Sequence, residues 1–321
     1  MRLIDNTSVN PYFNMAAEEY LLNTGKDDVF MLWQNAPCVV IGKNQNALSE
    51  IDSDVLRREN VGLVRRLTGG GAVYHDLGNL NYSLFLYHTD RNYDFSQFSR
   101  IVADCLGRMG LKAEYSGRND LLLDGCKISG CSQLLHNGRL LHHGTLLISS
   151  DLTALSRVLR PSAEKYTGRA IRSVASRVCN VNDHLKVKVT AAQMKDRLFR
   201  SMDINPADTF SEEELKEIGR LQHEKYSTWK WNYGDFPRYD FANQAKFASG
   251  LVHVTFSTKH GYMECLKFSG DFFGNRDIRE LELLLRGKRH QENSLMEALN
   301  SIDMEDYIHG VSAKEIIGLL F

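Results

Sequence analysis

The sequence has little proline and no excess of charge of either sign. Its 321 residues include 5 prolines beside 24 glycines, which is typical of a compact fold and not of a low-complexity chain. Lysine and arginine number 39 and aspartate and glutamate 40, so the formal net charge is −1. This balance excludes proteins that bind nucleic acid or anionic membranes through charge alone. The 43% share of hydrophobic residues is enough to bury a sizeable core.

Long apolar runs and paired cysteines are also absent. No stretch approaches the ~18 consecutive apolar residues of a membrane span, and no apolar segment follows the basic residue near the start, so a signal peptide is not expected. The six cysteines are scattered without a C-x-x-C pair, as expected for reduced thiols in a cytoplasmic protein. The P-loop pattern GxxxxGK[ST] and the hydrolase motifs GxSxG and HExxH do not occur.

Periodicity predicts an α+β fold with a mixed or antiparallel sheet. The dipeptides Asp124–Gly125 and Asn137–Gly138 are typical of tight hairpin turns, because their residues tolerate positive φ. Strands that arrive mostly as hairpins, with helices between them, favour this fold class over a doubly wound parallel sheet. Strands are predicted near 29–33, 38–41, 79–87, 121–123, 133–135, 139–141 and 145–148, and helices near 11–24, 96–109, 152–159, 191–202 and 211–226.

A change of character near residue 246 predicts a second domain. An aromatic-rich segment over 229–241 reads as a tether. It is followed by a hairpin around His260–Gly261, helices near 278–285 and 294–299, and a last helix opened by a capping box at 312–315. We therefore expect a catalytic domain over 1–243 and a small α+β accessory domain over 247–321.

The most unusual segment runs from residue 65 to 76 and contains three consecutive glycines. Glycine has the largest backbone entropy cost of any residue, so three in a row between strand signals indicate that bare backbone is needed there. Main-chain N–H groups of such a loop can approach an anion or a flat ligand, and the preceding Arg65 and Arg66 suit phosphate or carboxylate. The alternative is a glycine bulge in a sheet beside exposed arginines.

Two further groups of residues carry charge or histidine. Asp120 and Lys127 flank the turn at Asp124–Gly125, which can bring carboxylate and ammonium onto neighbouring strands; an ordinary cross-strand ion pair is the simpler interpretation of that segment taken alone. His142 and His143 are adjacent in a predicted strand and therefore point to opposite faces. A shared metal ion is not expected, and one histidine lining a pocket is the better interpretation.

A cationic segment over 165–177 contains no acidic residue. Lys165, Arg169, Arg172 and Arg177 lie here with Gly168 as a hinge, and such a loop can close over phosphates. A solvated basic surface is the alternative, and without the other segments it is the preferred one.

Together these segments resemble the lipoate–protein ligase A family. The pattern Arg-Arg-x-Ser/Thr-Gly-Gly-Gly-Ala-Val-x-His-Asp-x-Gly-Asn is present over residues 65–79. It is followed by family-like segments at 118–120, 127–130, 142–147, 171–174, 229–233 and 270–274, so the resemblance covers nearly the whole chain.

The resemblance implies a biotin/lipoate ligase-type catalytic domain with a small accessory domain. It also implies a two-step activity: ATP and lipoate give lipoyl-AMP and pyrophosphate with Mg²⁺, and the lipoyl group then passes to a lysine of a lipoyl domain. The implied acceptors are 2-oxoacid dehydrogenase E2 subunits and the glycine-cleavage H protein. We expect a cytoplasmic monomer without nucleic-acid or membrane partners.

The resemblance also assigns roles to residues. Lys127 would be catalytic, bridging the acyl oxygen and the α-phosphate, and Asp120 would serve the Mg²⁺–phosphate region or accept a proton. Arg66 and His143 would line the acyl pocket. The residues expected to contact ATP or lipoate are Arg66, Thr68, Gly69, Gly70, Gly71, Ala72, Val73, Tyr74, His75, Asn119, Asp120, Lys127, His143, Lys165 and Arg172.

Two other functions stay open on the sequence. Related acyltransferases use a cysteine nucleophile, so Cys131, four residues after Lys127, raises the possibility of a lipoyl or octanoyl transferase that works without its own adenylation step. The sequence also departs from the family pattern at Leu67 and Leu134, where some members carry a cation, so nucleotide contacts at these two positions are not expected. A module that binds an acyl-adenylate without turnover is the third interpretation.

Overall fold

The computed structural model describes residues 1–87, 95–116, 120–159, 178–202, 208–233 and 240–321, and these residues form two compact units. The first unit comprises Met1–Val40, Leu48–Arg65 and Val73–Asn232. The second comprises Ile41–Ala47, Arg66–Ala72 and Tyr233–Phe321. The second unit thus includes two short segments from the first quarter of the chain, one of them the glycine-rich segment.

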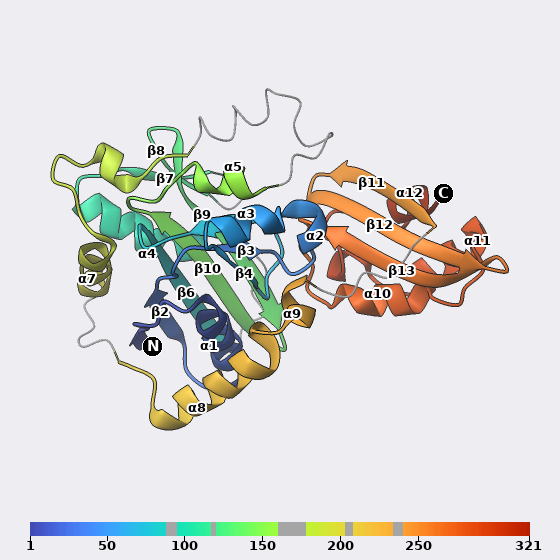
Figure 1. The fold of residues 1–321 in the computed structure, drawn as a ribbon, viewed down its shortest axis with the longest axis horizontal. Coiled ribbons are helices and arrows are strands. Elements are labelled where there is room, and N and C mark those ends of the chain that lie inside the picture. Colours follow the sequence, from blue (N-terminus) through green and yellow to red (C-terminus); the bar gives the residue numbers. More distant parts are fainter. Residues whose placement is uncertain (88–94, 117–119, 160–177, 203–207, 234–239) are drawn as a thin grey trace. The chain divides into compact units, whose positions relative to one another are not determined.

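A seven-stranded sheet forms the centre of the first unit (Figure 1). The two outermost strands on one side pair parallel and the other neighbouring pairs are antiparallel, which confirms the mixed sheet expected from the sequence. The strands lie in the order β1 (Arg2–Asp5), β2 (Val29–Trp33), β6 (Asn79–Tyr87), β10 (Arg139–Leu147), β9 (Cys126–His136), β8 (Asp120–Leu123) and β7 (Ala113–Ser116).

A second, three-stranded sheet holds the two ends of the glycine-rich segment. Its central strand β3 (Cys38–Ile41) lies between β4 (Gly62–Arg65) and β5 (Val73–His75). The sequence places β3 directly after β2, but the two strands belong to different sheets. The segment between β4 and β5 is therefore a connection between two strands that share the same neighbour.

The longer helices of the first unit begin at or close to the predicted residues. Asn10 caps α1 (Pro11–Thr24) by accepting from the N–H groups of Tyr12 and Phe13, and proline occupies the first helical turn. The other helical segments before residue 234 are α2 (Ala47–Glu50), α3 (Ser53–Arg58), α4 (Phe95–Arg108), α5 (Ala154–Val158), η1 (Val181–His184), α7 (Ala191–Ser201), α8 (Glu212–Leu221), η2 (Gln222–Tyr226) and α9 (Trp229–Tyr233). The short α2, α3 and η1 were not predicted. No described helix has the length and apolarity needed to cross a membrane.

The second unit has its own sheet and its own core. The sheet order is β11 (Phe241–Phe247), β12 (Gly250–Lys259) and β13 (Tyr262–Gly270), and the helical segments are α10 (Ile278–Leu285), α11 (Glu292–Leu299), η3 (Met304–Asp306) and α12 (Ala313–Leu320). The interpretation of 229–241 as a tether missed α9 and the start of β11. β11 is an edge strand with mostly exposed residues, so its sequence lacks the apolar alternation of a half-buried strand.

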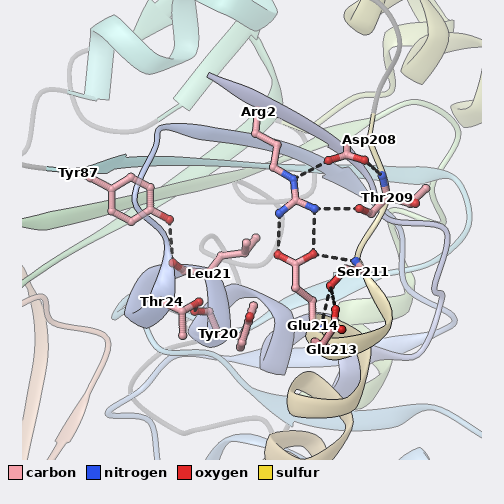
Figure 2. Close-up of polar contacts among 10 residues, drawn as sticks. All are labelled: Arg2, Tyr20, Leu21, Thr24, Tyr87, Asp208, Thr209, Ser211, Glu213 and Glu214. Carbon is pink, nitrogen blue, oxygen red and sulfur yellow. Dashed lines mark hydrogen bonds and ion pairs between the residues drawn. The ribbon is translucent and has the colours of Figure 1, made fainter.

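An ion pair that is partly shielded from water joins helix α8 to strand β1 (Figure 2). The Arg2 guanidinium donates to both carboxylate oxygens of Glu214, at 2.6 and 2.9 Å, and to Asp208 at 2.9 Å. Glu214 also accepts from the N–H of Ser211, completing the capping box of α8. Hydrogen bonds from Arg2 are the largest cause that holds the pKa of the Glu214 carboxyl below its usual value.

We expect Glu214→Gln to lower the free energy of unfolding by about 1 kcal/mol at neutral pH, because the bidentate pair is partly shielded from water. A carboxyl whose pKa is depressed in the folded state stabilises above its unfolded pKa and stops doing so as the pH falls through its folded pKa. The difference between Glu214→Gln and wild type should therefore shrink in acid. Urea unfolding at several pH values measures it, with the exposed Glu213→Gln as the control.

Candidate active site

The site is centred on an ion pair between β8 and β9. Lys127 Nζ lies 2.7 Å from Asp120 Oδ1, and both side chains are about one-third exposed. The turn at Asp124–Gly125 has positive φ at both residues, as its sequence predicts, and it brings the two strands together. The juxtaposition expected from the sequence is confirmed.

A β-bulge aims Lys127 at Asp120. The pairing of β8 with β9 shifts register, so that Leu121 faces Ser129 but Leu122 faces Lys127. Asp120 faces Gly130. A bulge turns side chains away from the regular alternation, and here the lysine side chain runs along the strand toward Gly130. Sequence reasoning missed this bulge, for which the glycine was the only available signal.

Gly130 leaves room for the lysine side chain. A Cβ at this position would lie 3.0 Å from Lys127 Nζ and 3.1 Å from its Cε, and 3.8 Å from Asp120 Oδ1. The N–H of Gly130 donates to Thr145 Oγ1 at 3.3 Å, which connects this strand to the next sequence motif on β10. A larger residue here would force the end of the lysine side chain to shift, so glycine permits the observed position of the ammonium group.

The His-His-Gly-Thr motif over residues 142–145 lies on β10, which pairs with β9. Gly144 faces Cys131 in the β9–β10 register, and a Cβ on Gly144 would lie 2.4 Å from the hydroxyl of Tyr82. That hydroxyl is hydrogen-bonded to the Cys131 thiol at 2.9 Å. The glycine therefore admits a buried tyrosine between the strands.

His143 is held by a buried carboxylate. Its Nδ1 lies 2.8 and 3.0 Å from the two oxygens of Glu18 on α1, so Nδ1–H donates to the carboxylate. Glu18 is only 1% exposed and also accepts from Ser83 at 2.6 Å, whose oxygen in turn accepts from Trp33 Nε1 at 2.8 Å. Sequence reasoning identified His143 but not Glu18, because that residue lies 125 positions away in the chain.

His142 points to the opposite face, as expected. Its Nδ1 accepts from the side-chain amide of Gln133 at 2.9 Å, and burial lowers its pKa to about 3, so the imidazole is neutral. Among the residues that the structure describes, no group of three or more histidines, cysteines or acidic side chains is arranged to hold a metal ion.

His75 on β5 ends a chain of buried amides. Asn6 donates to Asn14 at 2.9 Å, Asn14 donates to Asn35 at 2.8 Å, and the Asn35 amide lies 3.0 Å from His75 Nδ1. Because the amide nitrogen of Asn35 donates, His75 Nδ1 accepts and the ring proton lies on Nε2. Val73 and Tyr74 share this strand, and burial is the largest cause that raises the pKa of Tyr74.

Arg66 folds the glycine-rich segment onto itself. Its Nε donates to Thr68 Oγ1 at 3.0 Å, and its Nη2 donates to the carbonyls of Gly69 and Gly71 at 2.7 and 2.9 Å.

Arg65 was expected to bind an anion, but its guanidinium instead donates to the main-chain carbonyls of residues 231 and 232. These hydrogen bonds hold α9 in place.

The three glycines differ in their physical surroundings. A Cβ on Gly69 would lie 2.4 Å from the carbonyl oxygen of Phe272, so close backbone approach requires glycine there. Gly70 has a φ of +94°, which other residues rarely adopt. A Cβ on Gly71 would meet nothing within 4 Å, so neither packing nor positive φ requires glycine at this position, next to Ala72.

Three of the expected ligand contacts lie outside the described residues: Asn119, Lys165 and Arg172. The remaining expected contacts are distributed over both units. Val73, Tyr74, His75, Asp120, Lys127 and His143 belong to the first, and Arg66, Thr68, Gly69, Gly70, Gly71 and Ala72 belong to the second.

Comparison with known proteins decides the family. Residues 10–203 match the Lipoyl protein ligase A/B catalytic domain, and residues 236–320 match the Bacterial lipoate protein ligase C-terminus. The chain belongs to the lipoate–protein ligase family. It is 34% identical over 331 residues to the lipoate-protein ligase LplJ of Bacillus subtilis, with 100% of both chains covered. A lipoate–protein ligase 1 of Staphylococcus aureus is 35% identical over 329 residues, again with 100% of each covered.

Solved structures agree with this membership of the ligase family. A lipoate-protein ligase A bound with ATP superimposes with a TM-score of 0.63 and 30% identity, covering 73% of this chain and 98% of its own. LipL1 of P. falciparum, in complex with lipoate, shares the fold with a TM-score of 0.80 and 23% identity, covering 99% of this chain and 98% of its own. The fold and the enzyme family expected from the sequence are confirmed.

Gly130→Ala tests the placement of Lys127, the residue expected to be catalytic. The new methyl group meets the flexible end of Lys127 and no backbone, so we expect an unchanged melting temperature and a roughly tenfold loss of ligation activity. Thermal unfolding and a lipoylation assay measure the two effects. Gly107→Ala, where a Cβ meets nothing within 4 Å, is the control and should keep full activity.

Gly69→Ala and Gly71→Ala separate a packing glycine from an open one. The Cβ at 69 overlaps the Phe272 carbonyl, so we expect a loss of about 1–3 kcal/mol in the stability of the second unit. The Cβ at 71 overlaps nothing, so that variant should unfold like wild type. Equal stability of both variants, measured by thermal unfolding, would refute this division of roles.

Proposed function

We propose that this chain activates lipoate with ATP to form lipoyl-AMP, and then transfers the lipoyl group to a lysine of a lipoyl domain. The Asp120–Lys127 pair on adjacent strands is the observation that carries this proposal. The named activity of the relatives and the ATP-bound and lipoate-bound states of the structural neighbours support it. We also propose a functional division into a catalytic part over 1–243 and an accessory part over 247–321.

In the first step an oxygen of the lipoate carboxylate attacks the α-phosphorus of ATP, and the bond to the bridging oxygen breaks to release pyrophosphate. Two anions must approach each other in this reaction, so a cation is needed between them. Lys127 supplies a compact ammonium with three donors, which suits contact with the acyl oxygen and an α-phosphate oxygen at once.

In the second step the ε-amine of the acceptor lysine attacks the acyl carbon, the bond to AMP breaks, and the amine loses a proton. Lys127 remains beside the acyl oxygen, where negative charge develops. Asp120 is the neighbouring carboxylate and is assigned to accept this proton or to the Mg²⁺–phosphate region. When bound, Mg²⁺ would neutralise phosphate charge, and a single carboxylate fits an ion that keeps most of its ligands as water and phosphate oxygens.

We assign His143 to the acyl pocket, where its ring would be held in a single orientation. The hydrogen bond to the buried Glu18 carboxylate holds the ring and directs Nδ1–H away from any substrate. Arg66, Thr68, Gly71 and the neighbouring Ala72 would contribute contacts from the glycine-rich segment.

Lipoyl domains are the proposed acceptors. One structural neighbour is described as an archaeal bipartite lipoate protein ligase with its E2 lipoyl domain, at 30% identity over 75% of this chain. The E2 subunits of 2-oxoacid dehydrogenases and the glycine-cleavage H protein carry such domains and are the acceptors we propose. The monomeric state and the cytoplasmic location remain part of the proposal.

A cysteine-dependent transferase is disfavoured by the surroundings of Cys131. The thiol is 5% exposed, lies in the core and contacts Tyr82 and Ser99. Burial raises the pKa of this thiol, so the nucleophilic thiolate is suppressed.

Lys127→Ala should abolish lipoate-dependent exchange of label between pyrophosphate and ATP, with a loss of at least ~100-fold, since the bridging cation disappears. Lys112→Ala, an exposed lysine on the same unit, is the matched control and should retain exchange. Cys131→Ser should also retain both exchange and transfer.

Exchange that survives in Lys127→Ala would remove this lysine from the mechanism. Loss of transfer from a carrier protein in Cys131→Ser, with no exchange in wild type, would favour the transferase instead.

A further inference from the structure

Two cysteines bracket the main chain of Lys127. Cys126 precedes it at the start of β9 and is half-buried. Cys179 is 8% exposed, and its N–H donates to the Lys127 carbonyl at 2.9 Å. Neither thiol has a part in the proposed reaction.

The two thiols lie in the same part of the core. Lys127 forms a parallel bridge with Val178, which places Cys179 opposite Ile128, two residues after Cys126. All three belong to or pack against one apolar cluster, and the Cys126 thiol is near enough to contribute to the raised pKa of Cys179.

A histidine that can accept a proton lies beside the Cys179 thiol. His184 Nδ1 lies 2.9 Å from Asp124 Oδ2, and a carboxylate accepts, so Nδ1 carries the proton. His184 Nε2 is then an acceptor, and it lies 3.3 Å from the Cys179 sulfur. Cys179, His184 and Asp124 therefore form a relay that removes a proton from the thiol.

We propose that Cys126 and Cys179 are a reversible redox site, which a peroxide converts to a disulfide that slows lipoate activation. The peroxide O–O bond breaks as the more accessible Cys126 sulfur is oxidised to sulfenic acid, releasing one water. The Cys179 sulfur then attacks the Cys126 sulfur as its proton passes to His184 Nε2. The S–OH bond breaks, and His184 gives the proton to the departing hydroxyl, which leaves as a second water. Two electrons pass from the thiols to the peroxide in total.

The order of the two steps follows from the surroundings of the thiols. Burial, followed by the hydrogen bond to Cys126, raises the pKa of Cys179 to about 12, so this group stays a thiol in the reduced protein. It consequently needs His184 to attack, whereas Cys126 is open to the oxidant.

The disulfide would displace the backbone of Lys127. A disulfide needs Cα atoms roughly 4.4–6.8 Å apart and sulfurs about 2.05 Å apart, which is closer than two thiols approach without a bond. Closing the bond therefore draws together the segments on either side of the Lys127 carbonyl, to which Cys179 is hydrogen-bonded. A displacement of about 1 Å of a catalytic group costs up to about 100-fold in rate. This consequence rests on the proposed function, whereas formation of the disulfide does not.

The first experiment treats the full-length reduced protein with hydrogen peroxide. We expect an intact mass lower by two hydrogens and a crosslinked peptide that joins Cys126 to Cys179. In Cys179→Ser, dimedone should label a sulfenic acid on Cys126. Oxidation without this crosslink, or with the label on another residue, overturns the redox site.

His184→Gln tests the relay, because glutamine keeps a polar side chain but cannot take the proton. Crosslinking should slow at least ~tenfold at neutral pH, and the final extent should be unchanged. An unchanged rate overturns the role of His184. Cys265→Ser, a half-buried cysteine of the second unit, is the control and should crosslink like wild type.

The second experiment measures lipoate-dependent exchange of label between pyrophosphate and ATP after oxidant and reductant have been removed. Exchange should fall about tenfold in the oxidised protein. It should return after dithiothreitol and resist peroxide in Cys126→Ser and Cys179→Ser. A full crosslink with unchanged exchange overturns the effect on activation, while a reduced protein without exchange contradicts the proposed function and leaves the crosslink standing.

Discussion

The approach of a lysine ammonium to a carboxylate between two strands is the constraint on which the candidate site depends. The Lys127–Asp120 pair requires three features at once: a tight turn with positive φ, a bulge that shifts the register, and a glycine that leaves space beside the lysine. In an ordinary hairpin each of these features would lower the stability of the strand pairing. Together they place a cation where it can contact two anions, and each of these features occurs in the stretch from Asp120 to Gly130.

Strand pairing and buried hydrogen bonds connect this hairpin to the rest of the first unit. β9 pairs with β10, so the bulged strand is fixed from its other edge and the motif with His143 lies on the adjacent strand. His143 is oriented by Glu18, and His75 by a chain of three asparagines, so buried hydrogen bonds determine both ring tautomers. Buried polar groups that are satisfied in this way favour a single arrangement of the side chains.

The glycine-rich segment shows that one sequence pattern can have several causes. The three glycines were expected to present bare backbone to a ligand. The structure adds a close approach of Phe272 as a reason for Gly69 and a positive φ as a reason for Gly70, while a Cβ on Gly71 would meet nothing within 4 Å. Arg66 binds carbonyls of the same segment, and Arg65 fastens a helix. The conformation of this segment is therefore determined by the protein's own contacts.

The fold class and many of the elements could be predicted from the sequence, because helix caps, hairpin dipeptides and apolar periods are local signals. The family was indicated by the motif over residues 65–79 and the segments that resemble the family after it. Asn10, Asp124–Gly125 and Asn137–Gly138 all act as predicted. The edge strand β11 was missed because few of its residues are buried. Only the tertiary structure revealed the bulge at Lys127, the partner of His143 and the thiol pair at Cys126. These features join residues that are far apart in the chain or depend on strand register, which local sequence does not encode.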